Sequence, residues 1–117
     1  EIEWLENDFI PRVQKRGAEI ITARGASSAA SAANAIIDTL QNITTPTKEG
    51  DWFSLCLSSD GRYGIDAGLI VSFPCRSDGV HLSIIPGIEI NEFSQSKIRL
   101  TVEELRMEKV AVQELLP

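Results

Sequence analysis

Residues 24–40, RGASSAASAANAIIDTL, form a long helical pattern. Alanine and leucine favour the helix, and the periodic part of the run has no internal glycine or proline. Gly25 supplies a break before the run, and the hydroxyls of Ser27 and Ser28 are candidate N-cap acceptors. The pattern therefore predicts one helix over residues 27–40.

The predicted helix has one apolar stripe on an otherwise small surface. The stripe consists of Ala29, Ala33, Ile36, Ile37 and Leu40, which recur at helical spacing. Small residues suit a tightly packed core helix. The first turn, with free N–H groups and two hydroxyls, equally suits contact with a polar or anionic ligand. The pattern alone leaves both interpretations open.

Composition sets the class of protein. A chain of 117 residues with 43% apolar and 24% charged residues is typical of one soluble globular domain. The net charge of −6 argues against non-specific binding to nucleic acid or to anionic membranes. No apolar run is long enough for a membrane span, and no leader pattern opens the chain. Cys56 and Cys75 form no CxxC pair, so we expect reduced cysteines and no metal site.

The N-terminal residues predict a second helix, with periodic apolar residues through Val13, Ile20 and Ile21. Pro11 is tolerated only in a first turn or at a kink, and Gly17 weakens the middle. We therefore expect this helix to be bent or split in two.

The middle of the chain predicts three strands. Residues 52–58 alternate with Phe53, Leu55 and Leu57 on one side, and residues 69–73 form an apolar run that Pro74 closes. The turn at residues 78–79 leads into an alternating run over residues 80–85, which predicts an antiparallel hairpin. This third run contains the only histidine, His81, with no acid or cysteine grouped around it in sequence. We interpret His81 as an ordinary strand residue rather than a general base or a metal ligand.

The C-terminal part predicts a linker and a helix. Residues 86–93 read as extended, and residues 101–104, TVEE, match a capping box before a periodic run. Glu103 and Glu104 then fall in the first turn, where the helix dipole favours them and no catalytic role is needed. Helices and an antiparallel sheet together predict an α+β domain.

Blocks of sequence along the whole chain resemble the C-terminal domain of malate dehydrogenase, cytosolic type, in the lactate/malate dehydrogenase superfamily. The blocks are residues 9–18 (FIPRVQKRGA), 27–33 (SSAASAA), 58–64 (SSDGRYG), 68–70 (GLI), 72–74 (SFP), 92–94 (EFS), 100–105 (LTVEEL) and 108–109 (EK). They occur in the order and spacing of that family. The resemblance implies an antiparallel sheet packed with long helices, with residues 1–117 forming the C-terminal domain for substrate binding and dimerisation.

The resemblance also implies what this chain lacks. It corresponds to roughly the last two fifths of a family member, without the N-terminal Rossmann domain that binds NAD. The catalytic histidine, the aspartate that orients it and the substrate-gripping arginines lie upstream, and His81 does not match the histidine motif. We therefore expect no catalytic, cofactor-binding or metal-binding residue here, and an inactive isolated chain.

The residues that the resemblance assigns to the site are Ser27 and Ser28, one of which approaches substrate and nicotinamide in the parent enzyme. A small hydroxyl can donate to a polar ligand without filling the pocket. The expected parent is a cytoplasmic, homodimeric, NAD-dependent enzyme that interconverts malate and oxaloacetate. A lactate dehydrogenase of the same superfamily and an independent, non-catalytic binding module remain as alternatives.

Overall fold

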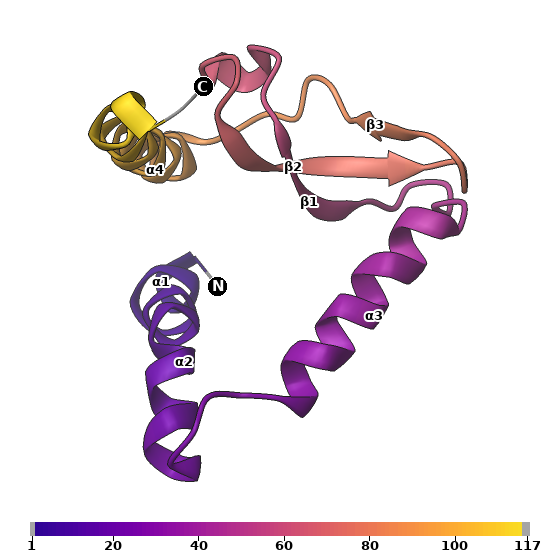
Figure 1. The fold of residues 1–117 in the computed structure, drawn as a ribbon. Coiled ribbons are helices and arrows are strands. Elements are labelled where there is room, and N and C mark those ends of the chain that lie inside the picture. The colour runs from indigo at the N-terminus through magenta and orange to yellow at the C-terminus, as the bar shows by residue number, and fades with distance from the viewer. Residues whose placement is uncertain (1, 116–117) are drawn as a thin grey trace. The chain divides into compact units, whose positions relative to one another are not determined.

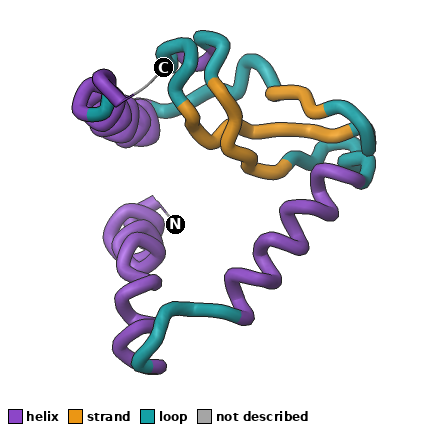
Figure 2. Tube along the Cα trace, in the orientation of Figure 1, coloured by secondary structure: helices purple, strands orange, loops and turns teal. Residues whose placement is uncertain are grey.

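The computed structural model describes residues 2–115 and combines helices with one antiparallel sheet, which confirms the α+β class (Figures 1 and 2). The chain divides into two compact units, Glu1–Leu40 and Gln41–Pro117. The boundary falls inside helix α3, Ala30–Thr44.

The first unit opens with helical segments that change type before Pro11. They are α1 (Ile2–Trp4), the π-helical turn η1 (Leu5–Phe9) and α2 (Ile10–Arg24). The Ile10 N–H donates to the carbonyl of Leu5, five residues back, and Pro11 occupies the first turn of α2, where its missing N–H costs no helical bond. The helix therefore changes type just before Pro11, but Trp4, Phe9 and Ile10 keep helical backbone angles, so the three segments run on without the predicted split. Gly17 lies inside α2 without interrupting it.

Helix α3 confirms the predicted central helix but has different bounds. It begins at Ala30, where Ala33 N–H donates to the Ala29 carbonyl at 2.9 Å, and it ends at Thr44. Ser27 and Ser28 therefore lie before the helix, so the prediction that their side chains cap it is wrong. The Arg24 guanidinium donates to the Ser27 carbonyl at 2.6 Å, which engages that carbonyl outside the helical ladder.

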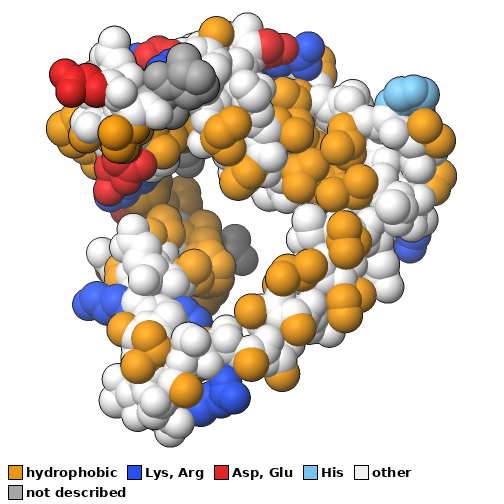
Figure 3. Space-filling view, viewed as in Figure 1, with side chains coloured by type: hydrophobic (Ala, Val, Ile, Leu, Met, Phe, Trp, Pro, Cys, Tyr) orange, Lys and Arg blue, Asp and Glu red, His pale blue; other side chains and the backbone are white. Residues whose placement is uncertain are grey.

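The apolar stripe of α3 is exposed within this chain. Ile36, Ile37 and Leu40 are all exposed, and none of the described residues of α3 is buried. Hydrophobic side chains follow the length of this helix in the space-filling view (Figure 3). Within this chain, α3 therefore does not pack as a core helix.

The second unit contains a sheet of three antiparallel strands in the order β1-β2-β3. The strands are β1 (Phe53–Ser58), β2 (Ile70–Ser77) and β3 (Leu82–Ile84). Phe53, Leu55 and Leu57 are half-buried while the residues between them are exposed, as the alternation predicts. The predicted hairpin between the second and third strands is also confirmed.

The prediction that Pro74 closes the second strand is wrong, because β2 continues through it to Ser77. The register places Pro74 opposite Ile85, one residue past the end of β3, and Ile85 N–H donates to the Pro74 carbonyl at 2.9 Å. The missing proline N–H therefore faces a position beyond the last residue of β3, and the ladder of that strand stays intact.

Helix α4 spans Glu92–Ala111 and is followed by the 3-10 turn η3, Gln113–Leu115. The Asn91 side chain caps α4, since it accepts from Ser94 N–H at 2.8 Å. The capping box predicted at residues 101–104 is wrong, because Thr101 lies in the middle of this helix. Glu103 accepts from Arg106 on the helix surface rather than facing a helix terminus.

The core of the second unit joins the sheet, the loop after β1 and α4. Its buried members are Ile65, Leu69, Phe73, Cys75 and Val102. The loop of residues 59–69, which contains the 3-10 turn η2 (Arg62–Gly64), folds around Ser59. The Ser59 backbone bonds to Leu69 and Gly68, and its hydroxyl donates to the Ile65 carbonyl at 2.9 Å. This closed loop presents Ile65 and Leu69 to α4.

Candidate functional site

Ser27 and Ser28 lie in the connection between α2 and α3. Gly25 ends α2 in the left-handed conformation, with φ of 73°, and donates its N–H to the Ile21 carbonyl at 2.8 Å. Ser27 is exposed and Ser28 is half-buried. The structure thus places both serines together at the start of α3.

The residue before α3 is Ala29, whose side chain cannot bond the backbone N–H groups of the first turn. The carbonyl of Ala29 accepts the first helical bond, and an alanine side chain has no oxygen to bond the N–H groups of the first turn. Unbonded N–H groups carry the positive end of the helix dipole. With two adjacent hydroxyls, this end of α3 can donate hydrogen bonds to an anionic or carbonyl oxygen.

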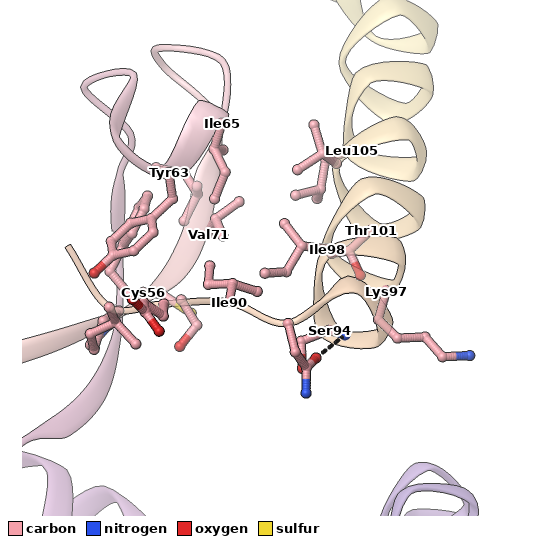
Figure 4. A pocket seen from close by; sticks show the side chains of 18 of the residues that line it. Cys56, Tyr63, Ile65, Val71, Ile90, Ser94, Lys97, Ile98, Thr101 and Leu105 are labelled. Atoms are coloured by element: carbon pink, nitrogen blue, oxygen red, sulfur yellow. Dashed lines mark hydrogen bonds between the residues drawn. The ribbon is translucent and has the colours of Figure 1, made fainter. Parts of the chain in front are cut away.

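A second feature is an apolar pocket in the second unit, with a volume of about 770 Å³ (Figure 4). It is lined by Trp52, Cys56, Tyr63, Ile65, residues 70–74, residues 88–91, Ser94, Lys97, Ile98, Thr101, Val102 and Leu105. Ile98 and Leu105 of α4 face Ile65 and Val71 across it. We call this feature the apolar pocket.

Several polar side chains line the apolar pocket, among them Ser94, Lys97 and Thr101 of α4. The Asn91 side chain is engaged in capping α4, and Lys97 points away from the cavity (Figure 4). The lining contains one acidic residue, Glu89, and no histidine. This composition offers a packing surface rather than a set of groups for proton transfer.

His81 lies in the turn between β2 and β3, so its assignment to a strand is wrong. Asp78 holds this turn: its carboxylate accepts from Val80 N–H at 2.8 Å and His81 N–H at 2.7 Å, and it pairs with His81 Nδ1 at 3.1 Å. The backbone N–H groups of His81 and Val80, with the His81 ring, lower the pKa of Asp78 from 3.8 to about 2. His81 is exposed and does not line the apolar pocket.

The remaining candidate groups are accounted for by local structure. Both cysteines are free, as expected: Cys56 is exposed on β1, while Cys75 is buried on β2, and burial raises the pKa of its thiol. Within residues 2–115, no three His, Cys, Asp or Glu side chains gather as a metal site. None of the helices in that range combines the length and hydropathy that crossing a membrane needs.

The family resemblance proposed the serine segment, and nothing in the sequence predicted the apolar pocket. Its walls come from β1, β2, the segment after β3 and α4, which are far apart along the chain. The only hint in the sequence was the alternating pattern of residues 52–58, which includes Cys56. Such a pattern predicts a strand, but it does not say which element packs against either face of that strand.

Comparisons with known proteins cover nearly the whole chain. A model of the lactate/malate dehydrogenase α/β C-terminal domain matches residues 2–116. Malate dehydrogenase from Naegleria fowleri is 43% identical with a TM-score of 0.87, over 97% of this chain and 35% of that chain. Lactate dehydrogenase from Trichomonas vaginalis is 26% identical with a TM-score of 0.85 over the same shares, and one of its structures is a complex with NADH and oxamate. The chain spans about a third of the length of these relatives.

Proposed function

The chain belongs to the lactate/malate dehydrogenase family of oxidoreductases as its α/β C-terminal domain, and from this membership we propose that it is the C-terminal part of an NAD-dependent malate dehydrogenase. The observation that supports this proposal most strongly is the 43% identity to a malate dehydrogenase over 97% of the chain. The antiparallel sheet of the described residues supports a cofactor site elsewhere in the parent enzyme, because a dinucleotide crevice needs parallel strands with a glycine-rich turn. Cofactor binding in the parent enzyme therefore belongs to its upstream Rossmann domain.

The contribution of this chain to catalysis is a wall of the substrate pocket. NAD, when bound by the upstream domain, accepts the hydride from malate. Ser27 or Ser28 donates a hydrogen bond to a carboxylate or carbonyl oxygen of malate or oxaloacetate, and the N-terminal turn of α3 favours the negative charge of the dicarboxylate. These groups orient the substrate, whereas the proton acceptor and the arginines lie upstream.

Assembly and location follow from the same proposal. The parent is a cytoplasmic homodimer, and α3 contributes to the contact between subunits. Exposed Ile36, Ile37 and Leu40 on this helix support an intermolecular role, because a large apolar stripe is costly to leave in water.

Lactate dehydrogenase is the second candidate, since the Trichomonas vaginalis enzyme matches the same share of the chain with a TM-score of 0.85. The lower identity, 26% against 43%, favours malate as substrate. An independent, non-catalytic binding module is the third candidate. In that case the parent protein, in which this chain is joined to its upstream sequence, should neither bind the cofactor nor turn over substrate.

Comparing the parent enzyme with the 117-residue chain tests the proposal. We expect the parent to bind NADH and to oxidise it with oxaloacetate. The isolated chain should leave NADH fluorescence unchanged at micromolar concentrations. Binding of NADH by the isolated chain would show that the cofactor site is misplaced, and a parent without turnover would favour the binding module.

A further inference from the structure

We propose that Ser77, the last residue of β2, and Gly79, in the turn after it, are positioning residues for the substrate. They fix the C-terminal end of α3, and the opposite end of that helix carries Ser27 and Ser28. The inference rests on the proposed function, in which one of these two serines contacts malate or oxaloacetate. It adds residues far from the serines along the chain that decide where their hydroxyls lie.

Ser77 binds the end of α3 with its side chain and its backbone. It is only 7% exposed, and its hydroxyl donates to the Ile43 carbonyl at 2.5 Å and accepts from Gly79 N–H at 2.9 Å. Its backbone N–H donates to the Thr47 hydroxyl at 2.9 Å, and its carbonyl accepts from Thr47 N–H at 2.8 Å. Ile43 lies in the last turn of α3, where carbonyls have no helical partner. A residue of the sheet therefore bonds the helix terminus directly.

Gly79 fits closely against the chain that leaves α3. A β-carbon at this position would lie 3.3 Å from Pro46 Cδ and 3.5 Å from the Thr44 carbonyl oxygen. A side chain therefore has no room here unless Pro46 moves. We call the hydrogen bonds of Ser77 and this packing of Gly79 the α3 anchor.

Helix α3 transmits the effect of the α3 anchor to the serines. It runs from Ala30 to Thr44, so about 20 Å separate its first turn from Ile43 at about 1.5 Å per residue. A tilt of about 5° at the α3 anchor moves the far end by about 2 Å over that length. None of the described residues of α3 is buried, so bonds at its end carry much of the work of fixing its direction. A shift of this size breaks a hydrogen bond between a serine hydroxyl and a substrate oxygen.

The chain contains a second copy of the same local arrangement, because residues 59–61 and 77–79 both read SDG. Ser59 is 5% exposed; its hydroxyl donates to the Ile65 carbonyl at 2.9 Å and accepts from Gly61 N–H at 3.1 Å. Gly61 has a φ of 97°, close to the 94° of Gly79, but a β-carbon there would meet no atom within 4 Å. The first copy bonds within the closed loop and the second bonds the end of α3, so the first is a matched control.

The test measures substrate and cofactor binding in the intact parent enzyme. Ser77→Ala and Gly79→Ala should raise the KM for oxaloacetate by on the order of fivefold or more and leave the Kd of NADH unchanged, because the cofactor binds upstream. Thr47→Val replaces the hydroxyl that accepts from Ser77 N–H by a methyl group. This milder variant should raise KM by a smaller factor, and it serves where Ser77→Ala does not fold.

The controls are Ser59→Ala and Gly61→Ala. They remove the same kind of hydrogen bonds or force the same positive φ on alanine, so they should lower stability while leaving KM and Kd as in the wild type. A loss of folded enzyme lowers the apparent kcat but not KM, and KM therefore separates positioning from stability.

A double-mutant cycle tests whether the α3 anchor acts through the serines. Combined with whichever of Ser27→Ala and Ser28→Ala lowers kcat/KM, Ser77→Ala should cost less than it does alone. The positioning role is overturned if Ser77→Ala and Gly79→Ala change KM no more than their controls, if the cycle is additive, or if neither serine variant has an effect. In a parent that reduces oxaloacetate, these results overturn the positioning role alone. A parent without NADH-dependent turnover overturns the proposed function, and the positioning role with it.

Discussion

Tyr63 donates its hydroxyl to the backbone carbonyl of Ile85 at 2.5 Å. This carbonyl is the one that the N–H of residue 74 would bond in an unbroken ladder, and residue 74 is a proline. Arg62 donates to the neighbouring carbonyl of Ile84 at 3.2 Å. The closed loop thus supplies a side-chain donor, the Tyr63 hydroxyl, to the carbonyl for which β2 has no backbone donor.

Removing the Tyr63 hydroxyl should destabilise the protein. Tyr63→Phe keeps the ring beside Phe73, with centroids 6.2 Å apart in the native protein, but leaves the Ile85 carbonyl without this donor. We expect a loss of about 1 kcal/mol in the free energy of unfolding, measured by urea denaturation. An unchanged free energy would mean that water replaces the hydroxyl at no cost.

The elements that could be predicted from sequence are those that local pattern determines. Phe53, Leu55 and Leu57 alternate over a full strand, so β1 was predicted almost to the residue. The start of α4 was missed because the TVEE pattern at residues 101–104 imitates a capping box, while the true cap is the single residue Asn91. Likewise, local rules predict that a proline ends a strand. β2 continues through Pro74 because β3 ends before the position that needs the missing N–H, and because the Tyr63 hydroxyl donates to the Ile85 carbonyl instead.

The candidate site divides in the same way. Ser27 and Ser28 could be named because a family resemblance covers them, and the structure adds that Ala29, rather than either serine, precedes the first turn of α3. The apolar pocket could not be predicted, because the positions of Val71 and Ile98 relative to each other depend on how the closed loop joins α4 to the sheet.

The Asp78 turn predicts a specific acid sensitivity. The folded pKa of Asp78, about 2, lies below its ordinary value of 3.8, so the carboxylate stabilises the fold above pH 3.8. That contribution is lost as the pH falls from 3.8 towards 2. The melting temperature of wild type should therefore fall more steeply over this range than that of Asp78→Asn. Glu104→Gln, an exposed acid of α4, is the control and should follow wild type; parallel curves for all three proteins would contradict the assignment.

Substitutions at the two serines test whether either one contacts the substrate. In the parent enzyme, Ser27→Leu or Ser28→Leu should obstruct the substrate and lower kcat/KM for oxaloacetate by on the order of tenfold or more, with a smaller effect on stability. For the serine that contacts substrate, replacement by Ala should cost on the order of 1 kcal/mol of transition-state stabilisation, or about fivefold in kcat/KM. Ser31→Ala, inside the first turn of α3, is the matched control. If both Leu variants keep wild-type kcat/KM, the serines are not part of the substrate pocket.

Association of the isolated chain should reflect its exposed apolar surface. Val13 and Ile21 of α2 and Ile36 and Ile37 of α3 are exposed. The net charge of −6 opposes association, but it acts weakly at physiological salt. We expect the sedimentation coefficient of the isolated chain to increase with concentration. A single monomeric species at all concentrations would show that these faces are covered within the chain.

The central claim is that this domain belongs to a malate dehydrogenase, and a comparison of substrates tests it most directly. The measurement is kcat/KM of the intact parent enzyme with NADH and either oxaloacetate or pyruvate. We predict that oxaloacetate is the preferred substrate by on the order of a hundredfold or more, as a site built for a second carboxylate requires. A preference for pyruvate would identify a lactate dehydrogenase instead, and no turnover with either acid would contradict the assignment to a dehydrogenase.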